Sequence, residues 1–132
     1  MAKATQLKPT EAELAILRVL WDHGPCTVRL VHEALGGDQR VGYTTTLKLM
    51  QIMVDKGLVV RDERRRSHIY SPTVDEGQTL GQIVTDLVGR AFGGSARKLI
   101  LQALSSGNIS PEEIHKIRKL LGEQGGKKHG SD

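Results

Sequence analysis

The residues of this chain with the clearest chemical potential lie between Gly42 and Pro72. A helical pattern there carries hydroxyl, ammonium and amide groups on one side, and three consecutive arginines follow further along. Such groups form hydrogen bonds with phosphate oxygens and with base edges, and arginine adds positive charge. The stretch therefore predicts contact with a nucleic acid. The polar residues of the helix and the arginines are Thr44, Thr45, Lys48, Gln51, Arg64, Arg65 and Arg66.

A helix and a hairpin must position these groups. Leu47, Met50 and Val54 recur with helical spacing and give the helix one apolar face. Gly57 follows a basic last turn and is typical of a helix stop. Two strand-like runs, at residues 58–60 and 68–70, then flank a turn that contains the arginines. A helix followed by a basic hairpin favours a winged helix, in which the helix reads the major groove and the hairpin, or wing, meets the DNA backbone.

The residues upstream supply two more helices. Thr10 and Glu13 have the spacing of a capping box, and Gly24-Pro25 ends the helix that they begin. Thr27 can cap a second helix that runs to Leu35. Three helices with tight links, followed by a hairpin, indicate a winged helix-turn-helix DNA-binding domain, which we predict over residues 1–74.

Downstream of Pro72 the sequence favours three amphipathic helices, a module that we predict over residues 75–121. So short a module leaves much apolar surface open, and we expect a second copy of the chain to cover it. Residues 122–132 are polar and glycine-rich and are predicted to be disordered. The fold class is therefore mainly α with a small β-wing. The apolar residues predicted to form the dimer are Leu80, Ile83, Val84, Leu87, Val88, Phe92, Leu99, Ile100, Leu104, Ile114, Ile117, Leu120 and Leu121.

Composition narrows the class of protein further. The net charge of the 132 residues is +4, and residues 40–68, with seven basic and three acidic residues, carry all of that excess. A charge so placed fits a surface that binds a polyanion. One cysteine, no secretory signal and no membrane-spanning run predict a cytoplasmic protein that does not enter a membrane. No catalytic grouping, phosphate loop or metal-binding cluster is visible, so we expect no enzyme and no cofactor.

We expect the DNA-contacting residues to lie at the start of the helix and at the tip of the wing. Threonine can hydrogen-bond a base or touch a thymine methyl group, lysine suits guanine or phosphate, and arginine suits phosphate or a narrow minor groove. Thr46 can instead turn inward. Each group also has a purely structural interpretation. The helix residues are then a capped helix with a solvated face, the three arginines are a solvated charge run, and Tyr43 packs against the wing. The predicted set is Arg40, Tyr43, Thr44, Thr45, Thr46, Lys48, Gln51, Arg64, Arg65, Arg66 and His68.

Three segments resemble the BlaI/MecI/CopY family of bacterial repressors. They are LKPTEAELAILRVLWDHGPCTVRLVHEAL, YTTTLKLMQIMVDKGLV and FGGSARKLILQALSSGNISPEEIHKIRKLL, which cover most of residues 7–121 in the family's order and spacing. The resemblance implies a homodimeric repressor whose partner is double-stranded DNA with an inverted-repeat operator. It also implies control of genes for β-lactam resistance or copper handling.

The resemblance further implies how repression ends. In the β-lactam branch a sensor-linked protease cuts the dimerisation module before a phenylalanine that follows an asparagine. The matching bond here is Ala91-Phe92, where alanine stands in place of the asparagine. Phe92 is otherwise interpreted as an aromatic residue of the dimer core. The copper branch carries paired cysteines near its C-terminus, and this chain has none there.

Two further interpretations of the chain are a winged-helix module that binds proteins and a repressor that senses metal through histidines. The basic wing and the polar threonine face argue against the first, because protein-binding faces are usually more apolar or aromatic.

Cys26 is either a redox sensor near a helix start or a small core residue. The histidines show no spacing typical of metal ligands; they are His23, His32, His68, His115 and His129.

Overall fold

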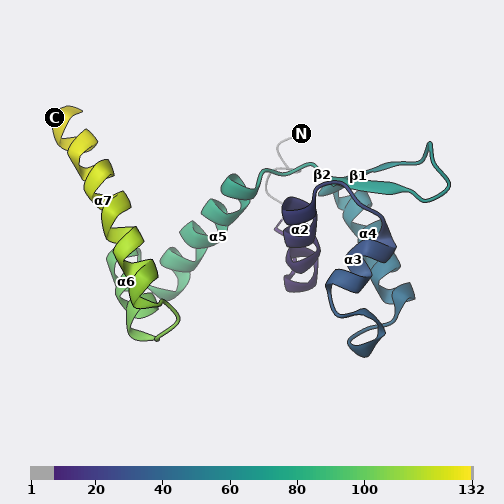
Figure 1. Ribbon diagram of the computed structural model, residues 1–132, viewed down its shortest axis with the longest axis horizontal. Helices are drawn as coiled ribbons and strands as arrows, with labels where there is room; N and C mark the ends of the chain where they lie inside the picture. The colour runs from purple at the N-terminus through teal and green to yellow at the C-terminus, as the bar shows by residue number, and fades with distance from the viewer. Residues whose placement is uncertain (1–7, 132) are drawn as a thin grey trace. The chain divides into compact units, whose positions relative to one another are not determined.

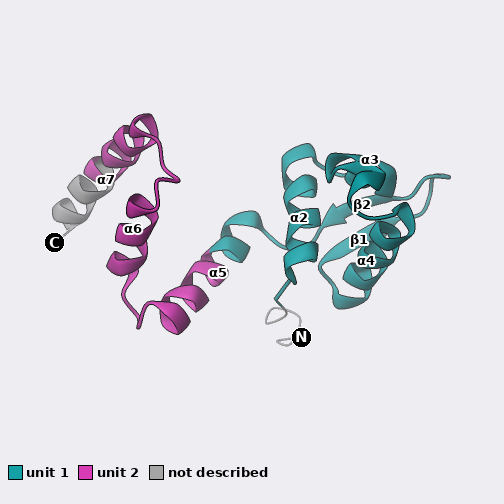
Figure 2. Cartoon of the chain, turned by 90° about the horizontal axis from the view of Figure 1, so that it is seen from below, with its two compact units in different colours: residues 1–80 teal, residues 81–132 magenta. Residues whose placement is uncertain are grey.

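The chain divides into two compact units, residues 1–80 and residues 81–132 (Figure 2). The structure is a computed structural model that describes residues 8–131, with side chains up to residue 122. Over residues 8–75, the first unit contains three helices, a short 3₁₀ turn and a two-stranded sheet (Figure 1). They are α2 (Glu11–His23), α3 (Val28–Ala34), η1 (Gly37–Gln39), α4 (Tyr43–Lys56), β1 (Val59–Asp62) and β2 (Ile69–Pro72). This order confirms the predicted winged helix-turn-helix.

Helices α2 and α3 begin where their caps predict. The Thr10 hydroxyl accepts a hydrogen bond from the Glu13 amide at 3.2 Å, and Glu13 accepts one from the Thr10 amide at 2.9 Å. The Thr27 hydroxyl caps α3 by accepting from the Leu30 amide at 3.1 Å. Gly24 ends α2 at a positive φ of 84°, a backbone conformation that costs glycine little. Because these rules act over three or four residues, the sequence alone was sufficient to locate both helices.

Helix α4 ends as predicted but begins without a side-chain cap. Its C-terminal residue is followed by Gly57, which is left-handed with φ 82°. Its N-cap residue is Gly42, which has no side chain to accept from the first-turn amides. The carbonyl of Gly42 accepts from the Thr45 and Thr46 amides at 3.1 and 3.3 Å, so the helix begins with backbone hydrogen bonds alone.

The wing is an antiparallel hairpin whose register pairs Val59 with Pro72 and Asp62 with Ile69. Its loop extends beyond the helices of the first unit (Figure 1). The backbone of Cys26 adds an isolated bridge to Tyr70, with N···O distances of 3.1 and 2.9 Å, so the α2–α3 link is fixed to the sheet. The core beneath is largely aliphatic. It consists of Ile16, Leu17, Val19, Leu20, Cys26, Val28, Val31, Met50, Met53, Leu58, Val59 and Tyr70.

Three helices follow the sheet. They are α5 (Glu76–Ala91), whose first turn belongs to the first unit, α6 (Ala96–Ser105) and α7 (Pro111–Ser131). Ser95 caps α6 by accepting from the Lys98 amide at 3.1 Å, and Ser110 and Glu113 form the capping box of α7. Over residues 8–131, no helix is both long enough and apolar enough to span a membrane.

Helix α7 is longer than the apolar pattern indicates. The pattern ends at Leu121, whereas the helix continues to Ser131. The added segment is rich in glycine but contains no proline, which is the residue that most strongly forbids continuation of a helix. Its side chains lie outside the described part of the chain, and the disorder of residues 122–132 stays a prediction.

Candidate nucleic-acid interface

Helix α4 presents a polar face on one side and core residues on the other. Met50 and Met53 on the inner side are fully buried. Ile52 lies one helical turn after Lys48 and is 41% exposed, so it can offer an apolar contact to a thymine methyl group. Sequence reasoning did not select Ile52, because an apolar residue on a helix is first assigned to the core. The residues of the predicted set that α4 exposes are Thr44, Thr45, Lys48 and Gln51.

Thr46 does not lie on this face, and its inclusion in the DNA-contacting set is corrected. Its side chain is 1% exposed, and its hydroxyl lies 3.0 Å from Nδ1 of His32 on α3. The cause is the helical period, which places Thr46 four and seven residues before the buried Met50 and Met53. Thr46 therefore binds α4 to α3.

His32 links three elements of the first unit. Besides the contact with Thr46, its Nε2 lies 2.7 Å from Oδ1 of Asp38 in η1. Its ring meets the ring of Tyr43 edge to face, with centroids 5.6 Å apart and an interplanar angle of 86°. The His32 side chain is 5% exposed, whereas the Asp38 side chain is 85% exposed. An isolated histidine in a helical pattern gives no sign of these contacts, so the sequence did not reveal them.

Tyr43 packs against α3 and is half-buried, which differs from the proposed packing against the wing. The guanidinium of Arg29 lies 5.1 Å from the centroid of its ring, a cation–π arrangement. Arg29 thus adds positive charge beside the start of α4, although the sequence analysis did not select it. Arg40, also exposed, lies over Gly36, where a Cβ atom would come within 3.0 Å of its Cγ and Cδ. Gly36 therefore leaves room for the Arg40 side chain.

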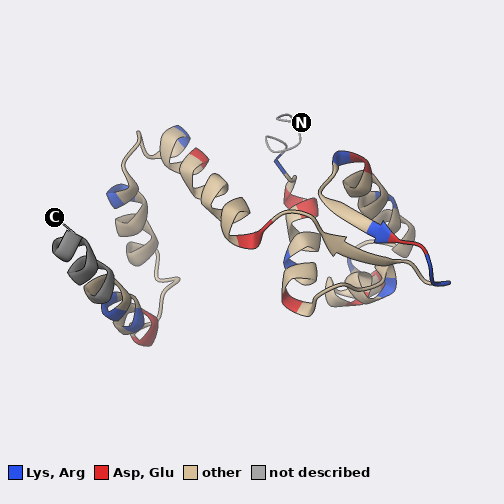
Figure 3. Ribbon diagram, turned by 90° about the horizontal axis from the view of Figure 1, so that it is seen from above, with Lys and Arg blue, Asp and Glu red and all other residues tan. Residues whose placement is uncertain are grey.

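From the end of β1 toward the tip of the wing, a basic segment is followed by an acidic segment and then by the basic tip (Figure 3). Asp62 accepts from the backbone amide and the guanidinium of Arg64, at distances from 2.8 to 3.3 Å. These hydrogen bonds hold the pKa of the Asp62 carboxyl well below its usual range. Asp62 consequently stays charged and offsets much of the charge of Arg64.

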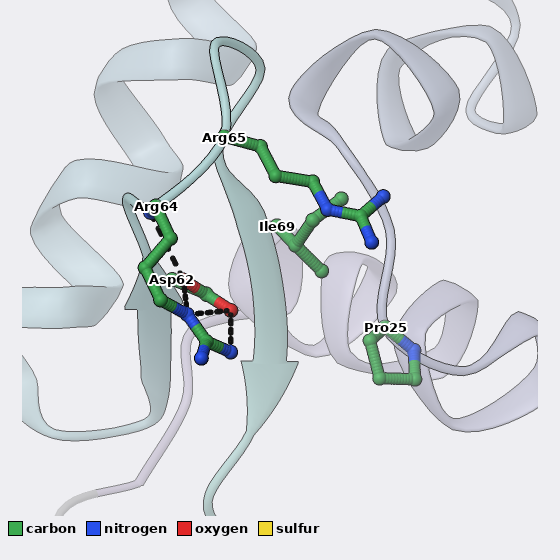
Figure 4. A pocket seen from close by; sticks show the side chains of 5 residues that line it. All are labelled: Pro25, Asp62, Arg64, Arg65 and Ile69. Carbon is green, nitrogen blue, oxygen red and sulfur yellow. Dashed lines mark hydrogen bonds and ion pairs between the residues drawn. The ribbon is translucent and has the colours of Figure 1, made fainter.

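Arg65 and Arg66 are the wing cations best placed for phosphate. Both are exposed, and within the described residues neither forms a salt bridge. Figure 4 shows Arg64 folded onto Asp62, whereas Arg65 extends on the other side of the hairpin above Ile69 and toward Pro25. Together these residues line a shallow pocket between the wing and the α2–α3 link. His68, at the return of the loop, is half-buried.

A buried ion pair joins the C-terminal end of α4 to the start of α2. The Nζ atom of Lys56 donates to both carboxylate oxygens of Glu13, at 2.8 and 2.9 Å. The Glu13 side chain is 2% exposed and that of Lys56 is 30% exposed. Burial by itself would raise the pKa of Glu13, but the hydrogen bonds from Lys56 and Thr10 outweigh it, so that this pKa is lowered. The sequence showed only the capping role of Glu13, because Lys56 lies 43 residues away.

Cys26 has the character of a core residue. It is 5% exposed, and burial raises the pKa of its thiol, which lowers its reactivity. Among the described residues no group of three or more His, Cys, Asp or Glu side chains could hold a metal ion. His129 lies outside the part of the chain whose side chains are described.

Helices α5 to α7 leave their apolar faces uncovered within one chain. Leu87 is 43% exposed, Ile100 is 54% exposed and Leu121 is 62% exposed. The other predicted dimer residues are exposed or half-buried, and none belongs to the buried core of the first unit. Phe92 is half-buried just after the end of α5.

The first unit defines the class of protein as a winged helix-turn-helix with a basic wing. A family model described as penicillinase repressor matches residues 9–123. The chain is 30% identical over 124 residues to "Transcriptional regulator BlaI" of Mycobacterium tuberculosis (strain CDC 1551 / Oshkosh), covering 93% of this chain and 88% of that protein. It is 23% identical over 128 residues to "Penicillinase repressor" of Bacillus licheniformis, and the match covers 97% of this chain and 98% of that protein.

The chain therefore belongs to the penicillinase repressor family, which confirms the resemblance found in the sequence. It is a transcriptional repressor and not an enzyme.

Proposed function

We propose that this repressor binds an inverted-repeat operator in double-stranded DNA as a homodimer. The start of α4 would enter the major groove and the wing would contact the backbone. The observation that carries the proposal is the exposure of Thr44, Thr45 and Lys48 on a helix whose opposite side buries Met50 and Met53 completely. A base-reading helix needs such a rigid support, because misplaced donors lose their base contacts. Because the N-cap of α4 is Gly42, no side chain competes with a phosphate oxygen for the amides of Tyr43 and Thr44, whereas the Thr45 amide already donates to the Gly42 carbonyl at 3.1 Å.

The remaining interface residues position the protein on the duplex. Arg40, Arg65 and Arg66 are exposed cations that fit phosphate contacts, and Arg29 over the ring of Tyr43 adds a further cation at the start of α4. Contacts of this kind set orientation and affinity, whereas base contacts set the sequence that is chosen. Gln51 and His68 would lie at the edges of the contact.

Dimerisation is proposed to run through residues 75–121, with residues 1–74 as the DNA-binding domain. The support is the set of apolar residues that α5, α6 and α7 expose in a single chain, since water-exposed leucine and isoleucine faces gain stability when a second copy covers them. Two-fold symmetry in the protein then matches two-fold symmetry in the operator. A repressor of this kind would act in the cytoplasm.

Relief of repression is proposed to follow cleavage at Ala91-Phe92 by a sensor-linked protease. The bond lies at the end of α5, and Ala91 is exposed. The amide of Phe92 still donates to the carbonyl of Val88 at 3.1 Å, as does that of Gly94 at 2.9 Å. A protease needs an extended backbone, so the last turn of α5 must open before cleavage, and the positive φ values of Gly93 and Gly94 weaken helix continuation there.

The operator proposal is tested by selecting bound fragments from sheared DNA of the host genome with purified protein at near-physiological salt. We expect one inverted repeat whose half-sites lie about one helical turn, roughly 10 base pairs, apart. Light scattering on the same sample should give twice the 14.5 kDa mass of one chain. A folded protein that enriches nothing over random fragments would contradict the proposal and would favour the protein-interaction module instead.

Cleavage is tested separately in host cells challenged with a β-lactam. Mass spectrometry should find a fragment that ends at Ala91, and a Phe92→Ala variant should remain uncleaved. Induction with the full-length chain still intact would refute cleavage without affecting the operator proposal.

A further inference from the structure

We propose that Asp38, His32 and Thr46 form a positioning relay that fixes the DNA-reading start of α4 and so determines sequence selectivity. The inference rests on the proposed binding of α4 in the major groove. None of the three residues touches DNA in this proposal. They act through the placement of Tyr43, Thr44 and Thr45.

The relay anchors a helix that has no side-chain cap. Helices α2, α3, α6 and α7 begin at threonine or serine side chains that hydrogen-bond first-turn amides. Helix α4 begins at Gly42 and has no such bond. Its first turns are instead tied to α3 by the Thr46 hydroxyl, 3.0 Å from Nδ1 of His32, and by the Tyr43 ring against the same imidazole.

Hydrogen-bond chemistry gives the relay a direction. A carboxylate only accepts hydrogen bonds, so Nε2 of His32, 2.7 Å from Asp38, must carry the hydrogen. In the neutral ring Nδ1 is then the acceptor, and the Thr46 hydroxyl donates to it. Asp38 thereby selects the tautomer that can accept from Thr46. Because His32 and Thr46 are buried, a lost partner would leave a polar atom without water to replace it.

The same contacts place the loop before α4. Asp38 lies in η1, and Gly36 and Gly37 on its N-terminal side have φ values of 108° and 63°. The loop between η1 and α4 carries Arg40, one of the predicted phosphate contacts. A loop held through Asp38 and a helix held through Thr46 share one imidazole, so their relative placement depends on His32.

Asp38 is the residue of the relay that can be changed with the least risk to folding, and removal of its charge distinguishes two explanations. The Asp38 side chain is 85% exposed, so Asp38→Asn should fold normally. If Asp38 acted only as a charge near DNA, its neutralisation would strengthen binding to every duplex, because a repulsive carboxylate disappears. A positioning role predicts the opposite for the operator. We expect affinity for the operator to fall about threefold to tenfold relative to a random duplex, because the amide that replaces the carboxylate accepts only a neutral hydrogen bond and no longer fixes the tautomer.

The experiment measures binding to two duplexes of equal length, the one selected by the wild-type protein and a random sequence. The test variants are Asp38→Asn, Thr46→Val and their combination. Thr46→Ser is the conservative control that keeps the hydroxyl. Asp22→Asn is the control for charge, because it neutralises an exposed acid on α2 that lies outside the relay. The losses of operator preference caused by Asp38→Asn and Thr46→Val should not add in the double variant, because both residues act through His32. Thr46→Ser and Asp22→Asn should keep the operator preference of the wild type.

A spectrum of the ring nitrogens provides a readout that a purely structural role would not change. Long-range ¹H–¹⁵N correlation should show hydrogen on Nε2 of His32 and a lone pair on Nδ1 in the wild type, and a shift in this balance in Asp38→Asn. This spectrum and the Asp38→Asn binding data decide the matter even if Thr46→Val fails to fold. An unchanged or improved operator preference in Asp38→Asn, or additive losses in the pair, overturns the relay. If the wild type selects no duplex, the operator proposal fails before any variant is compared.

Discussion

Replacement of Lys56 by methionine should strongly destabilise the N-terminal unit, because it leaves the buried Glu13 carboxylate without its cation. Removing one member of a buried ion pair typically costs about 3–5 kcal/mol. Here the loss is smaller, since Lys56 is 30% exposed and Glu13 keeps its 2.9 Å bond from the Thr10 amide. We expect a decrease of about 2–3 kcal/mol in the free energy of unfolding at pH 7.

A second substitution should recover much of that loss. Glutamine suits the third helical position of a capping box, so Glu13→Gln keeps the bond to the Thr10 amide while removing the buried charge. The double variant Glu13→Gln with Lys56→Met should therefore be more stable than Lys56→Met alone. If the unpaired Glu13 carboxylate causes the loss, the double variant recovers stability. If lost packing of the lysine side chain causes it, the double variant does not recover stability.

The pH dependence follows from the lowered pKa of Glu13. A carboxyl whose pKa is lower in the folded state stabilises the protein above its unfolded value, near 4.5. That contribution is lost as pH falls below 4.5 and through the folded pKa. In Lys56→Met the bond from lysine is gone and burial favours the neutral acid, so the deficit of this variant should shrink between pH 7 and pH 4.

Thermal unfolding followed by circular dichroism at one fixed protein concentration measures these effects, since dimerisation also contributes to stability. A deficit of about 2–3 kcal/mol should lower Tm by roughly 10–20 °C for a domain of this size. A Lys56→Met variant within about 0.5 kcal/mol of the wild type at pH 7, the usual range for surface substitutions, would refute the reasoning.

Three further variants test the interface and the dimer. Lys48→Ala should weaken operator binding by about 1–3 kcal/mol if the ammonium contacts a base, with little change on random DNA. Arg65→Ala should weaken binding to both duplexes alike and reduce the salt slope by about 0.9, whereas Arg18→Ala on α2 should not. Equal losses on both duplexes for Lys48→Ala and Arg65→Ala would overturn this division between base and backbone contacts. Leu87→Glu should convert the dimer to a monomer, and an unchanged mass in light scattering would contradict the proposed dimer interface.

Some features of this protein were predicted from the sequence, for a local reason. The capping box of Thr10, the cap of Thr27 and the stop at Gly57 act within a few residues, so their types and order are sufficient to place the helices. The hairpin likewise follows from two short apolar runs around a charged turn. The exposure of Lys48 and the burial of Met50 follow from the helical period.

Other features depended on residues that the fold brings together. Thr46 is as polar as Thr44 and Thr45, and although the helical period turns it toward the core, only the fold shows that its hydroxyl there meets His32, 14 residues away. Arg64 and Arg65 are adjacent and identical in type, yet the hairpin turns one onto Asp62 and the other to the opposite side (Figure 4).

The sequence by itself thus determined the elements, their order and the position of the basic surface, because these follow from periodicity, caps and charge along the chain. Only the tertiary structure decided that Glu13 and Lys56 form a buried pair and that His32 joins η1 to α4. Such contacts join residues that are far apart in the sequence, and local patterns such as caps and helical periodicity do not show which of these residues meet in space.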